Sequence, residues 1–564
     1  MLKIQDNNHK PIRQWENITS QKTVVFTVHN ASLVDCFEDE RGVTVFYGFL
    51  DQEHTGNSTA KFVAKQIEQT GVAGLNQCYG SFIVVHYEHS QQKFTLANDA
   101  LGDFALHYTT NGNVISISDF PKALLNKNNL AINNDRLLYY FALTQPSQNG
   151  CFFQQIQQLN AGQCLTIRGQ DMVVANYYRP PDTVNYKTRS IKDLSQQFIS
   201  LMQTVVKYQT QGQQRVGVMM SGGMDSTFVT VNCLQTQKQV SAFSYVFPNI
   251  PQANESVWID AMRKQNLKQG FQSLDMHTFS GEAYWSLKSP WHISLNTPVS
   301  NPYRLLKSVI YQNAHNRGLK ILLSGVFADH LYTGYIYWLV DQIKRKPITA
   351  IKSLYSLSKQ HGIKMSLKQI APAKWKSRAK LSAPWLSKQA QQLLGEKDKQ
   401  QQVIKHPHPQ QYTLTYGIAT AQAAWLDNEY SFKHNIVVRH PFRDRRIVEF
   451  LMSIPAWVLG DINNPKRFVK TASAGLLPDS IIRRTKITTL KPLFIKGVLD
   501  KELHKVRDLL ADTSCNWQQY INKKLITTML ANPQAHYQDS EYLALWQVIG
   551  FELWQRRLDS LRKR

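Results

Sequence analysis

The chain has 564 residues, 43% of them hydrophobic, and its 65 Lys and Arg residues against 40 Asp and Glu give a formal net charge of +25. This length exceeds what one hydrophobic core usually supports, so we expect at least two domains. No apolar run reaches the roughly eighteen residues of a membrane-spanning helix, and residues 1–16 are too polar for a signal sequence, so we expect a cytoplasmic protein without a transmembrane segment.

The first part of the chain, residues 1–181, alternates short apolar segments with polar turns. This pattern is typical of an antiparallel β-sandwich with few helices. The segment R-P-P-D at residues 179–182 is the expected linker to the next domain. The predicted strands are residues 23–28, 43–48, 81–87, 94–97, 114–118 and 164–167.

From residue 190 to residue 564 helical patterns alternate with short apolar strands at 216–220, 240–247 and 320–323. This order predicts an α/β domain with a parallel sheet, helices on both faces and a helical C-terminal part. Within it, residues from about 343 to 412 are rich in Lys and Gln. Both a solvated helical insertion and a basic surface that docks an acidic partner fit that composition.

The positive charge requires an anionic partner, and nucleic acid, ATP, pyrophosphate, an acidic peptide or a membrane surface would each satisfy it. The cysteines form no Cys-x-x-Cys pair, so we expect free thiols in a reducing compartment and no structural zinc site. The six cysteines are Cys36, Cys78, Cys151, Cys164, Cys233 and Cys515.

The most informative motif is S-G-G-M-D-S at residues 221–226, directly after the predicted strand 216–220. Gly222 and Gly223 lack a Cβ, so the backbone can turn sharply there and bring its N–H groups against an anion. Neighbouring serine hydroxyls can add donors. The pattern predicts a phosphate-binding loop, although a Gly-Gly pair taken alone is more often a tight strand-to-helix connection without a ligand.

Asp225 is unexpected in such a loop, because its carboxylate repels phosphates unless a divalent cation lies between them. Mg²⁺ is usually held by one or two carboxylates together with phosphate oxygens. The apolar residues 228–234 then predict a helix whose N-terminal dipole favours bound phosphate. The motif lacks the Gly-Lys-Ser/Thr ending of a Walker A loop.

A second polar break, S-G-V-F-A-D-H at residues 324–330, follows the predicted strand 320–323. Ligands bind beyond the carboxyl ends of strands in a parallel sheet, so the two breaks can face one crevice. Asp225 and Asp329 can then share one cation. His330 fits two roles equally, a general base for an attacking amine or a hydrogen-bonded structural residue.

With these residues the chain resembles the asparagine synthetase B family, whose synthetase domain belongs to the ATP pyrophosphatase superfamily. Further similar segments are R-H-P-F-R-D-R-R at residues 439–446, L-L-P at 476–478 and R-T-K at 484–486. The N-terminal part resembles the glutaminase domain of the family in Y-G-S-F at 79–82 and N-D-A-L-G at 98–102. The resemblance covers nearly the whole chain.

The resemblance breaks at position 2, where a glutaminase of this family needs a thiol and this chain has Leu2. Cys36 and Cys78 lie too far along the chain to replace it. We therefore expect a degenerate glutaminase-like domain kept for structure or docking. Loss of that cysteine separates asparagine synthetases from their lactam-forming relatives, β-lactam synthetase and the lasso peptide cyclases.

The second break also departs from the family pattern. Val326 stands where the family has an acidic loop residue, and His330 stands where the family has a final Glu. An Asp-His pair at this place is a feature of lasso cyclases. The resemblance implies that Asp225 and Asp329 hold Mg²⁺ and that Lys486 contacts the acyl-adenylate and stabilises charge during amine attack. The residues implied to bind ATP are Met219, Ser221, Gly222, Gly223, Asp225, Ser226, Ser324 and Gly325.

The resemblance predicts an ATP-dependent lasso peptide cyclase that acts on a ribosomally made precursor peptide. A side-chain carboxylate of the peptide would attack the α-phosphate of ATP, and the α-amine of the peptide would then displace AMP and close a macrolactam ring. The expected partners are the precursor peptide, a leader peptidase and a leader-binding protein, and no nucleic acid is expected. The basic segment 343–412 can hold the peptide tail during closure.

Other functions stay open at this point. A small-molecule β-lactam synthetase or an ammonia-dependent asparagine synthetase-like amide ligase would use the same motifs. An RNA-modifying ATP pyrophosphatase would suit the charge, but its usual cysteine pairs or RNA-binding module are not visible. A catalytically inactive scaffold is disfavoured because the S-G-G-x-D-S motif and both aspartates are intact.

Overall fold

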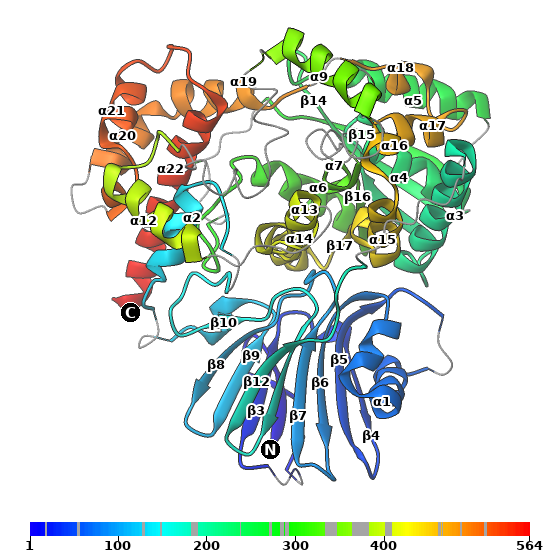
Figure 1. Ribbon diagram of the computed structural model, residues 1–564, viewed down its shortest axis with the longest axis vertical. Helices are drawn as coiled ribbons and strands as arrows, with labels where there is room; N and C mark the ends of the chain where they lie inside the picture. The colour runs from blue at the N-terminus through cyan, green and yellow to red at the C-terminus, as the bar shows by residue number, and fades with distance from the viewer. Residues whose placement is uncertain are drawn as a thin grey trace.

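The computed structural model joins an N-terminal β-sandwich to an α/β part whose C-terminal region is helical, which confirms the expected fold class (Figure 1). No helix within the described residues has the length and apolarity to cross a membrane. The structure describes residues 1–16, 18, 20–53, 57–126, 130–146, 149–181, 190–236, 238–269, 273–282, 287, 293–332, 347–361, 363, 383–400, 409–460, 464, 466–485, 488–511 and 516–563.

The sandwich consists of two six-stranded sheets, in the orders β10-β8-β9-β3-β1-β2 and β12-β11-β7-β6-β5-β4. All six strands predicted from the sequence are present, as β3, β5, β6, β7, β9 and β11. The bounds are β1 Leu2–Asp6, β2 Pro11–Trp15, β3 Thr23–Val28, β4 Val34–Glu38, β5 Gly42–Leu50, β6 Gly80–Glu88, β7 Lys93–Asn98, β8 His107–Asn111, β9 Val114–Ser118, β10 Gln157–Gln158, β11 Gln163–Arg168 and β12 Asp171–Asn176.

The second sheet is antiparallel throughout, but in the first sheet β3 runs parallel to both β1 and β9. The alternation of apolar residues could not show this, because it reports which face of a strand is buried and not the direction of its neighbour. Val24 and Phe26 of β3 pack against Val45 and Val85 of the other sheet in one continuous core. Helix α1, Thr59–Thr70, covers the outer face of the second sheet.

The α/β part contains a five-stranded parallel sheet in the order β15-β14-β13-β16-β17. Helices α3 and α4 pack on one face of the sheet, and α6 and α14 on the other. The strands are β13 Arg215–Met219, β14 Gln239–Val246, β15 Leu274–Ser280, β16 Ile321–Ser324 and β17 Val437–Arg439. The helices of this part are α3 Ile191–Gln209, α4 Met224–Gln235, α5 Ser256–Gln269, α6 Arg304–Asn316, α7 Ala328–Tyr332, α13 Pro409–Tyr416, α14 Ile418–Ser431, α15 Arg445–Ser453, α16 Ala456–Leu459, α17 Arg467–Ser473 and α18 Asp479–Ile482.

The C-terminal helices form a separate bundle around α22, and helix α2 from the N-terminal part joins it. The first turn of α2 is exposed at Asn134 and Asp135, whereas the residues from Arg136 to Phe141 are all buried. Phe141 of α2 packs against Phe551 of α22. The bounds are α2 Asn134–Phe141, α12 Lys388–Gln400, α19 Lys491–Phe494, α20 Leu503–Ala511, α21 Lys523–Ala531 and α22 Asp539–Arg562.

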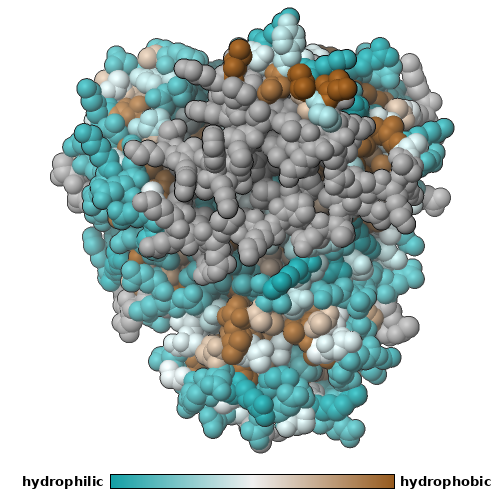
Figure 2. Space-filling view, viewed as in Figure 1, coloured by the Kyte–Doolittle hydropathy of each residue, from teal (hydrophilic) through white to brown (hydrophobic). Residues whose placement is uncertain are grey.

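The described parts of the basic segment 343–412 include helices α9, Pro347–His361, and α12. The basic clusters at residues 344–346 and 374–378 lie outside the described residues. Figure 1 places α9 at the upper edge of the molecule, and apolar side chains gather along that edge in Figure 2. Ile348 and Ile351 of α9 are largely exposed.

Candidate active site

The two polar breaks lie side by side at the carboxyl ends of β13 and β16, the central strands of the parallel sheet. Met219 pairs with Ser324 in the parallel register. A Cβ at Gly325 would lie 2.5 Å from the backbone nitrogen of Ser226, so only glycine allows the second break to pack directly on the first turn of α4. From β13 the chain adds β14 and β15 on one side of the sheet, and it then adds β16 and β17 on the other side. Ligands of open α/β sheets bind at such a switch point, beyond the carboxyl ends of the strands.

The first break forms a tight loop that is held by its own serines. Gly222 has φ +71°, which a residue with a side chain adopts only under strain. Ser221 donates its backbone N–H to Oγ of Ser226 at 3.0 Å, and Gly223 donates its own to Oγ of Ser221 at 3.4 Å. Gly223 is the N-cap of α4 and offers no side-chain cap. The loop therefore presents a helix N-terminus to the crevice, as a phosphate site requires.

An arginine from the C-terminal region stabilises this loop by a hydrogen bond to its backbone. Arg484 donates from Nη1 to the carbonyl oxygen of Gly222 at 3.4 Å and from Nη2 to Oε1 of Glu255 at 2.7 Å. Its guanidinium lies 3.7 Å from the ring centroid of Trp258. A Cβ at Gly222 would itself approach Trp258. The loop is therefore preorganised by residues far away in the sequence.

Lys466 brings the two expected metal ligands to one point. Its Nζ lies 2.8 Å from Oδ2 of Asp225 and 2.6 Å from Oδ1 of Asp329. The hydroxyl of Tyr332 donates to the other oxygen of Asp225. Lys466 has φ +60°, a left-handed conformation that is costly for lysine, and strain of this kind concentrates at functional sites.

The electrostatics of this cluster favour a cation between the carboxylates. Burial disfavours the charged ammonium of Lys466, but Asp225 and Asp329 together hold its pKa above the usual value. Within the described residues no group of three or more His, Cys, Asp or Glu side chains could hold a metal ion. Two carboxylates at a phosphate loop nevertheless fit Mg²⁺, because this ion takes its remaining ligands from phosphate oxygens and water.

Lys466 is the functional residue that sequence reasoning missed. The sequence pointed to Lys486 instead, which lies outside the described residues, so its role stays a prediction. Lys466 is the residue directly before α17, and the turn-forming residues Asn464 and Pro465 that precede it in the sequence are the only local signal. One lysine among many basic residues is not distinguishable until the fold places it beside Asp225.

His330 points away from this cluster, toward α13. Its ring packs 5.7 Å from that of Phe327, and a backbone hydrogen bond links it to Leu414. Burial lowers its pKa, and the nearby charge of Arg443 lowers it further. The charge of Asp329 acts in the opposite direction on this pKa. The part of His330 as a general base stays a prediction.

Residue 2 lies sealed in the sandwich core. Leu2 of β1 has no exposed surface and packs between the two sheets with Ile4 and Val24. Burial raises the pKa of Cys36 to about 11 and that of Cys78 to about 12, so neither thiol is an activated nucleophile.

The sandwich is nevertheless bound firmly to the α/β part through the R-H-P-F-R-D-R-R segment. Arg439 donates from Nη2 to Oδ1 of Asp51 at 2.6 Å, and Nη2 of Arg443 lies 2.6 Å from Oδ1 of Asp103. Arg446 donates to the carbonyl oxygen of Asp51 at 2.9 Å. The side chains of both ion pairs are nearly fully buried.

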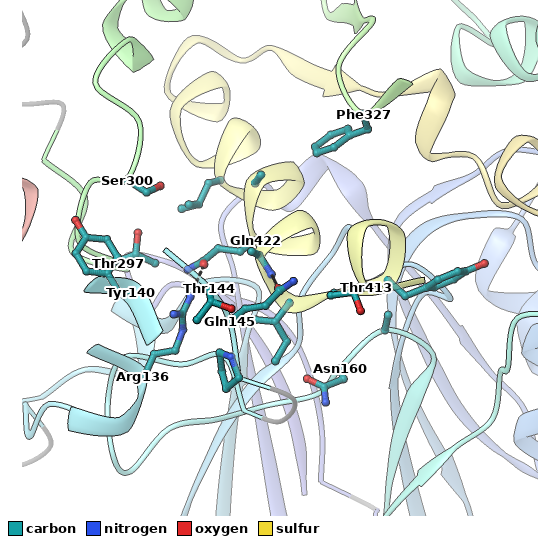
Figure 3. A pocket seen from close by; sticks show the side chains of 18 of the residues that line it. Arg136, Tyr140, Thr144, Gln145, Asn160, Thr297, Ser300, Phe327, Thr413 and Gln422 are labelled. Carbon is teal, nitrogen blue, oxygen red and sulfur yellow. Dashed lines mark hydrogen bonds between the residues drawn. The ribbon is translucent and has the colours of Figure 1, made fainter. Parts of the chain in front are cut away.

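A cavity of about 1470 Å³ opens beside the site, between the sandwich, α14 and the C-terminal bundle (Figure 3). Val326 and Phe327 line it, and these two residues separate Gly325 from helix α7, which carries Asp329. Among the described residues that line the cavity, the second break contributes Val326 and Phe327, whereas Asp225, Asp329 and Lys466 are absent. The cavity extends to Arg136 on α2.

Comparison with protein families gives two matches. A family model described as asparagine synthase matches residues 197–556, and one described as a glutamine amidotransferase domain matches residues 48–178.

Two curated proteins of Bacillus subtilis are similar to the chain. Asparagine synthetase (glutamine-hydrolyzing) 1 is 20% identical over 512 residues, which cover 84% of this chain and 77% of that protein. Asparagine synthetase (glutamine-hydrolyzing) 2 is 23% identical over 453 residues, 76% of this chain and 58% of that protein. Among solved structures, the U34-tRNA thiolase NcsA from Methanococcus maripaludis is 11% identical with a TM-score of 0.20, covering 44% of this chain and 89% of that one. That likeness is too weak to bear on the fold.

Proposed function

Because the chain belongs to the asparagine synthase family of ATP-dependent amide ligases, we propose that it adenylates a side-chain carboxylate of a precursor peptide and closes a macrolactam ring on the peptide's own amine. In the first step a carboxylate oxygen forms a bond to the α-phosphorus of ATP and pyrophosphate leaves. In the second step the amine nitrogen bonds to the acyl carbon, AMP leaves with the electron pair of the broken C–O bond, and the nitrogen loses a proton.

The convergence of Asp225, Asp329 and Lys466 beside the phosphate loop carries this proposal. The backbone N–H groups of the loop and the N-terminus of α4 bind phosphate oxygens. Asp225 and Asp329 would hold Mg²⁺, which supplies charge neutralisation for the pyrophosphate. Lys466 places a fixed positive charge where negative charge develops, and preorganised charge of this kind is often worth roughly 10²-fold or more in rate.

The buried Leu2 supports an amine that arrives with the substrate. A glutaminase needs a thiol to release ammonia, and residue 2 of this chain is a core leucine with no exposed surface. An ammonia-dependent asparagine synthetase would also tolerate this change. The proposal therefore needs a second observation to choose the substrate.

The size of the cavity supports a peptide. Sites for small molecules typically enclose about 300–1,000 Å³, and the cavity that begins at Val326 and Phe327 measures about 1470 Å³. A ring-closing enzyme must hold a folded chain around the reacting carboxylate, which requires such room. A leader peptidase and a leader-binding protein would then be its partners, since the free amine has to be released first.

Peptide-dependent ATP–pyrophosphate exchange with Mg²⁺ tests the proposal, together with mass spectrometry for a product lighter by one water. Asp225→Asn should abolish the exchange, because the carboxylate at the phosphate loop is lost. Asp171→Asn on the exposed strand β12 is the matched control and should exchange like the wild type.

Exchange with aspartate or another small acid, but not with the peptide, would refute the peptide assignment and support the small-molecule ligase. Exchange that survives in Asp225→Asn would refute the assigned site. Stoichiometric RNA binding that falls steeply with salt would instead favour an RNA-modifying enzyme.

A further inference from the structure

The far end of the cavity contains a buried arginine without a counterion. Arg136 on α2 is 4% exposed and lies in the cavity wall. Its Nε donates to the carbonyl oxygen of Gly150 at 3.0 Å and its Nη2 to Oε1 of Gln422 at 3.0 Å. Its Nη1 is buried and makes no hydrogen bond within the described part of the chain. Figure 3 shows the side chain rising from α2 toward Gln422.

The charge of Arg136 lacks a counterion within the described part of the chain. Among the described residues no acidic side chain forms an ion pair with it, and its guanidinium stacks 4.3 Å from the ring centroid of Phe152. Burial lowers its pKa to about 10, so it is still charged at neutral pH. A buried, unpaired charge costs several kcal/mol unless a ligand compensates it.

Basic side chains outnumber acidic ones among the other charged residues that line the cavity. Arg304 lies 4.8 Å from the ring centroid of Tyr430, and Lys307 pairs with Asp427 at 2.7 Å. The charged residues of the lining are Arg136, Arg179, Arg304, Lys307 and Asp427. The one carboxylate is thus already bound, and Arg136 is left to receive an anion from outside.

We propose that the cavity is the binding site for the substrate peptide and that Arg136 anchors a carboxylate of that peptide remote from the reacting one. The neutral part of the lining suits such a chain. Polar side chains on several sides of the cavity can form hydrogen bonds with a peptide backbone (Figure 3); they include Thr144, Asn160, Thr297 and Ser300. The peptide identity of the ligand rests on the proposed function, whereas the carboxylate site rests on Arg136 itself.

Two sources of carboxylate fit this anchor, an acidic side chain and the C-terminus of the peptide. Three acetylated heptapeptides of glycine, serine and one central residue separate them. The first has glutamate at the centre and an amidated end, the second glutamine and a free C-terminal acid, and the third glutamine and an amidated end. Titration calorimetry with the full-length protein, without ATP, measures binding independently of adenylation.

At least one acidic peptide should bind roughly tenfold to a hundredfold more tightly than the neutral peptide. This ratio of dissociation constants is what one hydrogen bond to a charged group contributes. Arg136→Gln should abolish this preference. Arg168→Gln removes an equal charge from the exposed end of β11 and should keep it. Arg136→Lys retains a cation with a different donor geometry, so it should keep the preference at reduced affinity.

Equal binding of all three peptides, no binding at all, or a preference that survives in Arg136→Gln would overturn the proposal. Arg136→Lys decides the question if Arg136→Gln does not fold, since loss of the preference with the charge retained would also contradict a charge-based anchor. Carboxylate binding without peptide-dependent exchange would refute the proposed reaction and leave the anchor intact.

Discussion

Two places in the molecule differ in kind, the start of β1 at residue 2 in the sandwich and the carboxyl ends of β13 and β16 in the parallel sheet. At the first, Leu2 is packed among apolar side chains with no exposed surface. At the second, Lys466 is held in a strained conformation between Asp225 and Asp329. The comparison teaches that residue 2 serves the apolar core of the sandwich, whereas the docking contacts and the charged cluster depend on other residues.

The docking contacts make this separation possible. Asp51 forms a buried ion pair with Arg439, and Asp103 forms one with Arg443. Leu2 takes no part in either ion pair. Removing one partner of a buried pair leaves the other charge uncompensated. The sandwich is therefore retained as a structural part of the molecule whatever happens at position 2.

The largest expected effect is on stability, from Asp51→Asn. Loss of this carboxylate leaves Arg439 buried without its counterion and should lower the free energy of unfolding by about 3–5 kcal/mol, measured by urea denaturation. Asp479→Asn at an exposed pair is the matched control and should change little. Equal effects in the two variants would show that the docking pairs do not hold the domains together.

Lys466→Ala should leave the fold intact and slow adenylation by about 10²-fold, because the fixed positive charge at the phosphate loop is lost. ATP–pyrophosphate exchange measures this. Lys470→Ala, one turn further along α17, should exchange normally. Normal exchange in Lys466→Ala would return attention to Lys486 as the catalytic cation.

A pH effect should appear at the junction of the two parts. Burial lowers the pKa of His440 to about 4 from 6.5, so the native state binds its proton less readily than the unfolded chain. The resulting stability is fully present above about pH 6.5 and is lost as pH falls toward 4. His440→Gln should reduce the drop in unfolding free energy between pH 7.5 and pH 5 by about 2 kcal/mol.

Thermal and urea unfolding at the two pH values measure this difference. His536→Gln, at an exposed position, should retain the acid sensitivity of the wild type. If His440→Gln is as acid-sensitive as the wild type, protonation of His440 does not couple to unfolding of the junction.

The smallest effect is expected from Leu2→Cys, which restores the residue type that a glutaminase needs. It should lower stability by about 1–2 kcal/mol through lost apolar burial and release no ammonia from glutamine, since the side chain stays sealed in the core. Ile4→Cys in the same strand should also lower the stability and release no ammonia. Ammonia release by Leu2→Cys alone would show that the glutaminase site is intact apart from its nucleophile.

Local patterns in the sequence predicted nine of the strands, including β13 and β16, the loop at residues 221–226 and the approach of Asp225 to Asp329. Each depends on a few neighbouring residues, and the meeting of the two aspartates follows from the rule that parallel strands end at one edge. The same reasoning could not find Lys466 or Arg136, because a single basic residue carries no periodic signal and acquires its role from partners hundreds of positions away.

Only the tertiary structure decided the directions of β1 and β9 beside β3, the transfer of α2 into the C-terminal bundle and the sealing of Leu2. Hydrophobic pattern specifies that a face is buried but not what covers it. The sequence by itself thus determined the resemblance to asparagine synthetases. The packing decided which charges lie beside a counterion, as Lys466 does, and which, as at Arg136, have none within the described residues.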